Sequence, residues 1–155
     1  MFGSSTPLTV SNFKKNISDN IYKNSKFYKL IEYSNTKTIR GGVINHENEE
    51  YVLNNKTLNT IPLEIQLTNR QEPIYNKEIS DPMEFKFLKN TLQKGSISMV
   101  KVSKTKSSST EFFISTQKSA VLEGRYSVFG KVIDGFEILE NLESNDYISE
   151  IEFNN

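Results

Sequence analysis

Three segments in the second half of the chain decide its fold: Gly95-Ser96-Ile97-Ser98-Met99-Val100, Glu111-Phe112-Phe113-Ile114, and Leu122-Glu123-Gly124-Arg125-Tyr126-Ser127-Val128-Phe129-Gly130-Lys131-Val132. From Ser96 to Val102 apolar and polar residues alternate, which is the pattern of a strand with one buried face, and the other two segments also have the composition of strands. We therefore predict strands over residues 96–102, 111–115 and 126–132. The serine-rich stretch at 103–109 is predicted to be a flexible loop between the first two.

Two helices are expected on either side of this strand region. Thr6-Pro7 supplies an N-cap hydroxyl and a proline at the first helical position. The apolar residues that follow at near-helical spacing, and so predict one buried face, are Leu8, Val10, Phe13 and Ile17. A second helix is predicted to begin at Asp134-Gly135, with Phe136, Leu139 and Leu142 as its apolar face.

The remaining segments predict further strands and two long connections. Residues 25–33 and 37–43 are expected to form a hairpin with a turn at 34–36, and 60–67 and 148–153 further strands. Residues 44–60 and 68–94 are polar or proline-containing and are predicted to be loop-rich. We thus expect one domain over residues 1–155, mainly β with two capping helices, arranged as a closed or nearly closed antiparallel barrel.

Composition excludes several kinds of chemistry. The 155 residues include no cysteine and only one histidine, His46, so a thiol nucleophile, a disulfide framework or a histidine-based metal site is not expected. Nineteen basic residues balance nineteen acidic ones, which gives no electrostatic reason to expect nucleic acid as a partner. No apolar run reaches the ~18 residues of a membrane span. We expect no cofactor and no metal.

The three quoted segments resemble motifs of the cyclophilin family of peptidyl-prolyl isomerases, which carry G-x-[IL]-S-M-A, S-Q-F-F-I and L-D-G-[KR]-x-x-V-F-G-K-V in this order. Upstream, residues 6–13, 27–31 and 39–42 resemble the family's A-P-x-T-V-x-N-F, F-H-R-V-I and x-Q-G-G segments. The resemblance implies an antiparallel barrel without its first two strands, and so with an exposed edge. Residues 61–65, 72–75 and 124–126 are most similar to the cyanobacterial and thylakoid-lumen branch.

The resemblance also implies a peptide-binding groove. It places Lys29, Arg40 and Phe113 at the catalytic positions, with Phe113 as the floor of a proline pocket. The implied substrate-binding residues are Met99, Val100, Lys101, Glu111, Leu122 and Tyr126. Glu111 and Phe113 lie two residues apart on a strand, so both are expected to face the groove while Phe112 turns to the core.

Several groove positions depart from the family. Lys29 replaces the catalytic arginine and loses its planar five-donor fork. Arg40 and Glu111 each replace a glutamine, and Glu111 is expected to pair with Lys29 or Arg40. Lys37 or a neighbour takes the place of a second pocket phenylalanine, and Tyr126 replaces a histidine. Val121 replaces the tryptophan associated with cyclosporin binding, so strong binding of that drug is not expected.

Two functions remain open at this point. The first is a prolyl cis-trans isomerase that assists protein folding, binds X-Pro peptides and forms no covalent intermediate. The second is a catalytically weak or inactive module that binds proline-containing segments of a partner during complex assembly. Proline-containing polypeptides are the expected partners in either case, and the chain is expected to be a monomer. The expected location is a plastid or plastid-derived compartment, or otherwise the cytoplasm.

Overall fold

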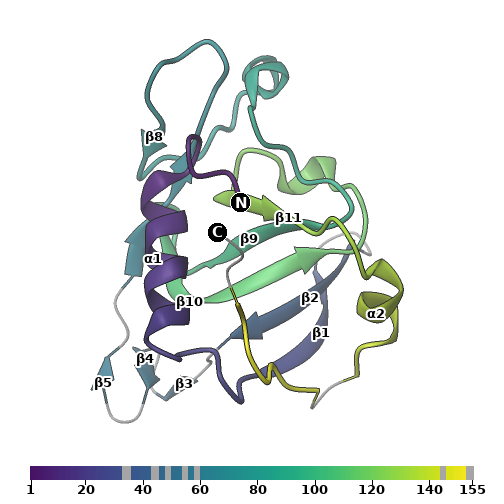
Figure 1. Cartoon of the computed structure of the whole chain (residues 1–155). Helices are drawn as coiled ribbons and strands as arrows, with labels where there is room; N and C mark the ends of the chain where they lie inside the picture. Colours follow the sequence, from purple (N-terminus) through teal and green to yellow (C-terminus); the bar gives the residue numbers. More distant parts are fainter. Residues whose placement is uncertain are drawn as a thin grey trace.

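The computed structural model describes residues 1–32, 36–42, 46–47, 50–53, 56–57, 60–143 and 146–152. Within these ranges it gives the backbone alone for 28–32, 36, 46–47, 50–53 and 56–57. The side chain of Lys29, residues 34–35 of the turn predicted at 34–36, and Phe153 therefore lie outside the described part. Figure 1 shows a sheet crossed on one face by a long helix and by the C-terminal segment.

The main sheet is antiparallel and has six strands, in the order β1-β2-β10-β9-β11, with β6 paired to β10 off this path. Its strands are β1 (Lys26–Glu32), β2 (Thr36–Gly42), β6 (Thr60–Pro62), β9 (Ser96–Lys101), β10 (Lys106–Ser115) and β11 (Val128–Lys131). Within the described ranges β1 and β11 do not pair, so the sheet stays open, as in part of a barrel. The predicted mainly antiparallel β fold with few helices is confirmed.

Small sheets flank the main one. The predicted loop at 44–60 contains three short strands, β3 (His46–Glu47), β4 (Glu50–Leu53) and β5 (Lys56–Thr57). The helical elements are α1 (Pro7–Ser18), α2 (Phe136–Asn141) and the 3₁₀ helices η1 (Pro82–Phe87) and η2 (Ala120–Leu122). None of the helices in the described ranges is long and apolar enough to cross a bilayer.

Helix α1 begins where the sequence predicts, with Thr6 at the N-cap and Pro7 in the first turn. Its buried residues are Thr9, Val10 and Phe13. Leu8, which was predicted to lie on the buried face, is 49% exposed. The carboxylate of buried Glu64 explains this rotation, because it accepts hydrogen bonds from the Leu8 and Thr9 amides and from Thr9 Oγ1. It satisfies amide donors that a helix start leaves without intrahelical partners.

The main core lies between α1 and the sheet. Its buried residues are Val10, Phe13, Tyr22, Met99, Phe112, Ile114, Phe129 and Ile148. The Phe13 and Phe112 rings meet nearly edge to face, with centroids 5.6 Å apart. Gly41 on β2 makes room for this cluster, since a Cβ there would lie 2.9 Å from both Phe112 Cζ and Phe27 Cε1.

Two predicted segments differ in the structure. The predicted loop at 103–109 is strand from Lys106 onward, and Ser107, Ser108 and Ser109 are buried. The partner that the sequence did not indicate is β6, whose residues 60–62 pair with 106–108. The predicted strand at 148–153 is not regular over 146–152, where Tyr147 makes a single bridge to Lys26.

The predicted connection at 68–94 belongs to a lobe, which lies at the top of Figure 1. The lobe has its own apolar cluster. The lobe contains β7 (Glu64–Ile65), β8 (Ile74–Tyr75) and η1. Its buried residues are Leu63, Ile65, Leu67, Ile79 and Leu88. The lobe is therefore a packed unit and not an open loop.

Candidate active site

Strand β10 separates two environments because successive side chains point to opposite faces of a sheet. Phe112 pairs with Gly41 and Met99 and belongs to the main core. Phe113 pairs with Arg40 of β2 and Ser98 of β9. Cross-strand partners lie on the same face, so Phe113 and Arg40 lie together on the face away from the main core.

A third apolar cluster surrounds Phe113 on this face. Its buried members are Leu92, Val100, Phe113, Leu122 and Val128, with Phe2 and Tyr126 packed against them. The rings of Phe113 and Tyr126 have centroids 5.0 Å apart at 81°, the edge-to-face arrangement favoured by aromatic pairs. The structure thus brings together the predicted site residues Val100, Phe113, Leu122 and Tyr126.

Neighbouring side chains cover Phe113 in this conformation. It is 1% exposed, and Leu122 is also 1% exposed, while Tyr126 is half-buried at the outer side of the cluster. A proline ring can therefore touch Phe113 only if a covering side chain such as Tyr126 turns aside.

Met99 does not belong to this site, contrary to the prediction. Its cross-strand partner is Phe112, and it lies in the main core with 0% exposure. Val100, the next residue, takes the place beside Phe113. The error has a simple cause: residues 99 and 100 are neighbours in sequence, but the strand's alternation puts them on opposite faces.

The polar side of the site contains a buried ion pair. Arg40 Nη1 lies 3.3 Å from Glu111 Oε1, and the two side chains are 20% and 1% exposed. The predicted pairing of Glu111 with Arg40 is thus present. Lys29 lies on β1, where its backbone partner is Ile39, whereas Arg40 pairs with Tyr28. The catalytic role of Lys29 stays a prediction.

A second ion pair connects the site to the lobe. Lys101 Nζ lies 2.5 Å from Glu78 Oε1, with side chains 25% and 21% exposed. The same ammonium lies 5.6 Å from the centre of the Tyr126 ring, within cation–π range. Lys101 therefore links the lobe residue Glu78 to the aromatic wall of the Phe113 cluster.

The loop that carries Leu122 and Tyr126 is held by backbone contacts on both sides. The Glu123 carboxylate accepts a hydrogen bond from the Leu92 amide, and burial raises the pKa of Glu123. Gly124 has φ +70°, and a Cβ there would lie 2.3 Å from Ile79 O. The amide of Ile79 donates to Gly124 O at 2.8 Å. Only glycine fits so close an approach to the lobe.

Sequence reasoning missed the contributions of Leu92, Glu78 and Glu123 to this region. Leu92 and Glu78 lie in the segment interpreted as a connection, where no periodicity marks them. Within the described ranges, no group of three or more His, Cys, Asp or Glu side chains is arranged to hold a metal ion.

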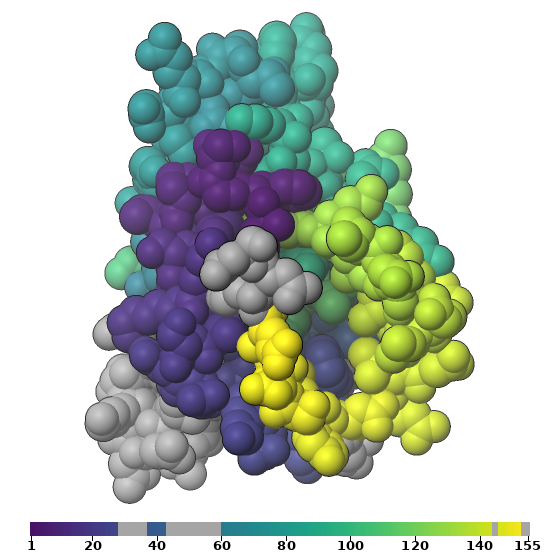
Figure 2. All heavy atoms as spheres, viewed as in Figure 1, coloured from purple at the N-terminus to yellow at the C-terminus, as the bar shows by residue number. Residues whose placement is uncertain are grey.

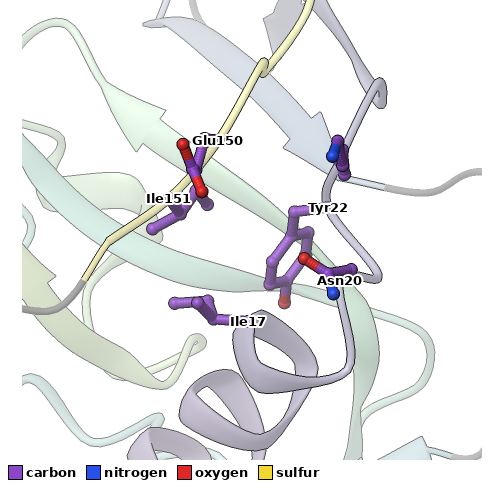
Figure 3. Close-up of a pocket in the computed structure, with 6 residues that line it drawn as sticks. Ile17, Asn20, Tyr22, Glu150 and Ile151 are labelled. Carbon is purple, nitrogen blue, oxygen red and sulfur yellow. The ribbon is translucent and has the colours of Figure 1, made fainter.

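Pockets elsewhere are poor candidates for the proline site. Figure 3 shows one between the end of α1 and the C-terminal segment, lined by Ile17, Asn20, Tyr22, Lys23, Glu150 and Ile151. Its volume of about 20 Å³ suits a single water molecule. It is too small to take a proline ring.

Comparison with known proteins identifies the family. The family model for cyclophilin type peptidyl-prolyl cis-trans isomerases matches residues 1–152. The chain therefore belongs to the cyclophilin family.

Individual relatives are distant in sequence. A putative thylakoid lumen peptidyl-prolyl cis-trans isomerase from Synechocystis is 27% identical over an alignment of 161 positions, gaps included, which covers 94% of this chain and 41% of the relative. Peptidyl-prolyl cis-trans isomerase 10 of Caenorhabditis elegans is 50% identical over 38 residues, 24% of each chain. The chain thus spans less than half the length of these curated relatives.

Solved structures support the same fold. A Cryptosporidium parvum cyclophilin type isomerase, crystallised in the presence of the dipeptide Ala-Pro, is 28% identical with a TM-score of 0.56, over 96% of this chain and 83% of its own. The cyclophilin AquaCyp293 from Hirschia baltica has a TM-score of 0.55 at 16% identity, over 97% of this chain and 64% of its own. At this identity, the similarity to AquaCyp293 supports the fold alone.

Proposed function

We propose that this chain binds X-Pro segments of polypeptides at the Phe113 cluster and accelerates cis-trans isomerisation of the prolyl amide. The observation that carries the proposal is the pairing of Phe113 with Arg40 across neighbouring strands, next to Leu122 and Tyr126. One side of the arrangement is apolar and suits a proline ring. The other side carries a cation that can reach the amide.

The chemistry requires no covalent bond. The prolyl amide crosses a barrier of about 18–20 kcal/mol, and uncatalysed exchange takes tens to hundreds of seconds. A site that holds the twisted amide more tightly than the planar one lowers this barrier. In the proposal the Phe113 cluster seats the ring and Arg40 acts as an electrostatic donor toward the amide. A contribution from Lys29 stays a prediction from the family motif, because the β1–β2 register pairs position 29 with Ile39 and not with Arg40. Val100 and Lys101 line the path of the peptide.

A second function, a binding module with little turnover, is favoured by one observation. The Arg40 guanidinium is already engaged by the buried Glu111 carboxylate. A donor directed at a carboxylate within the protein is less able to stabilise a developing amide lone pair. With lysine at position 29 instead of the family's arginine, peptide capture without fast exchange is the alternative outcome.

The proposal also includes the cellular process and the compartment. Assistance to protein folding, or to assembly of a complex, follows from binding proline segments of other chains. A plastid or plastid-derived compartment is supported by the cyanobacterial relative whose name places it in the thylakoid lumen. The Cryptosporidium relative crystallised with Ala-Pro supports Ala-Pro peptides as the first probes.

The test is exchange NMR on a short Ala-Pro peptide with and without protein. An isomerase broadens the cis and trans resonances at substoichiometric protein, and the broadening disappears in Phe113→Leu, which keeps most of the buried volume. Phe85→Ala in the lobe is the matched control, because it removes an aromatic ring from a separate cluster. Saturable peptide shifts without exchange identify the binding module, and no interaction at all contradicts both functions.

The role of position 29 needs its own comparison. If Lys29 supplies a donor, Lys29→Ala slows exchange while Lys29→Arg, which restores a rigid fork of donors, speeds it up. Lys26→Ala on the same strand serves as control for a general loss of positive charge. Equal rates in all three variants would contradict a catalytic contribution from Lys29.

A further inference from the structure

The zero net charge conceals a strong separation of charge along the chain. All nineteen Lys and Arg residues lie at or before Lys131. The C-terminal stretch after it holds only acidic charges, namely Asp134, Glu137, Glu140, Glu143, Asp146, Glu150 and Glu152. Figure 2 shows this stretch, from lime to yellow, on the right and lower part of one face of the molecule.

An open groove lies within this acidic surface. It is lined by Glu137, Ile138, Asn141, Leu142 and Asp146 and has a volume of about 270 Å³. Glu137 with Asn141, and Ile138 with Leu142, are four residues apart, so they form two adjacent rows on one side of α2 and just beyond it. One row is apolar, and the lining also includes the carboxylates of Glu137 and Asp146.

In the apolar row Leu142 is half-buried and Ile138 is open to solvent. Ile138 is 63% exposed, and Tyr147, next to the groove residue Asp146, is also 63% exposed. By contrast, Leu139 packs against the main core. Helix α2 thus packs one side against the protein through the half-buried Leu139 and leaves Ile138 open to solvent. Bulky apolar side chains exposed at a groove are a feature of interaction sites.

The opposite flank of α2 already binds a lysine side chain from another part of the chain. There Lys94 Nζ lies 2.7 Å from Glu140 Oε1 and 5.3 Å from the centre of the Phe136 ring. A lysine from another part of the chain thus combines a carboxylate and an apolar contact on α2. The groove flank offers the same combination in Glu137, Asp146 and Ile138.

We propose that the groove formed by Glu137, Ile138, Asn141, Leu142 and Asp146 docks a basic amphipathic segment of a partner protein, with bulky apolar side chains seated on Ile138 and Leu142. The open shape supports a peptide, because a segment of a partner can lie across the groove with only a few of its side chains seated in it. The charge supports a basic occupant. A second copy joined symmetrically through this face would place acidic residues against acidic residues, which opposes that contact.

The test uses three fluorescein-labelled peptides and fluorescence anisotropy. The probe repeats Lys-Leu-Ala-Lys-Leu-Ala-Ala, one control replaces each Lys by Glu, and the other replaces each Leu by Ser. The proposal expects saturable binding of the probe alone, with affinity falling severalfold as salt rises. Binding of the serine control with equal affinity would overturn it, since charge alone would then suffice, and so would failure of the probe to bind.

Variants locate the site on the chain. Ile138→Ser and Glu137→Lys change exposed side chains, so the fold is retained, and each is expected to weaken probe binding about tenfold. The matched controls are Met83→Ser and Glu84→Lys on η1, away from α2 in Figure 1, and they leave the affinity unchanged. Equal affinity in Ile138→Ser would overturn the proposal. So would a dimer in sedimentation that Ile138→Ser abolishes, because the occupant would then be a second copy.

Discussion

Glu111→Gln is the most informative change at the candidate site. The substitution keeps the shape of the side chain and restores the residue type that the family has there, but it removes a negative charge that is 1% exposed and 3.3 Å from Arg40. We expect two opposite effects. The folded state loses stability, and the Arg40 guanidinium becomes a better donor for a bound prolyl amide.

The loss of stability can be estimated from the geometry. Two unit charges 3.3 Å apart attract each other by about 5 kcal/mol at an effective dielectric constant of about 20. Desolvation of the buried carboxylate cancels much of this attraction. The glutamine oxygen also still accepts a hydrogen bond from Arg40, worth roughly 1 kcal/mol less than the charged one. The expected net loss is therefore about 1–3 kcal/mol.

Urea denaturation measures the free energy of unfolding, and exchange NMR on the Ala-Pro peptide measures turnover. Glu140→Gln is the matched control, because its pair with Lys94 is shorter, at 2.7 Å, but the side chains are 51% and 59% exposed. Solvent screens such a pair, so its removal should leave the unfolding midpoint nearly unchanged. If Glu111→Gln left the free energy of unfolding unchanged, or raised it, the idea that burial strengthens the Arg40–Glu111 pair would be wrong. A slower exchange rate would refute the inhibitory role assigned to Glu111.

Two further predictions concern packing and pH. Gly41→Ala should cost about 1–3 kcal/mol of stability in urea denaturation, because the new methyl would lie 2.9 Å from the Phe112 ring, whereas Gly130→Ala, with 3.5 Å to its nearest neighbour, should cost clearly less. Equal costs would contradict the packing explanation. Burial raises the pKa of Glu123, so the folded protein holds this proton more tightly than the unfolded chain. Stability should therefore fall as the pH rises from the ordinary glutamate value through the raised one, and Glu123→Gln, which keeps an acceptor for the Leu92 amide, should flatten that part of the pH profile. An unchanged profile in the variant would show that other groups cause the dependence.

The sequence predicted the strands whose patterns are local. Alternation located β9, and the strand predicted from Glu111 to Ser115 is the second half of β10. The placement of Phe112 and Phe113 on opposite faces followed from the two-residue period of a strand. The first half of β10 was missed, because Ser107 and Ser108 are buried by pairing with β6, a contact with no local signal. Leu8 was misplaced since the orientation of α1 depends on the distant carboxylate of Glu64.

The candidate site was predicted from family motifs more than from physical pattern. Motif order brought Arg40, Phe113 and Leu122 to one region, and the structure places them there. The position of Met99 was wrong, although strand alternation alone could have corrected it. The ion pair between Lys101 and Glu78 had no signal in the sequence, because it depends on how the lobe folds back against the sheet.

The order of strands in the main sheet has a consequence for biosynthesis. Strand β2 pairs with β1 on one side and with β10 on the other, and β10 is also the partner of β6 and β9. Until residue 115 has emerged from the ribosome, a nascent chain can form the β1–β2 hairpin, but the second edge of β2 has no strand to pair with. Contacts so distant in sequence form slowly, and an unpaired edge can recruit other chains in the meantime. Translation products that stop before β10 should therefore aggregate, although they already contain the α1 helix and the hairpin.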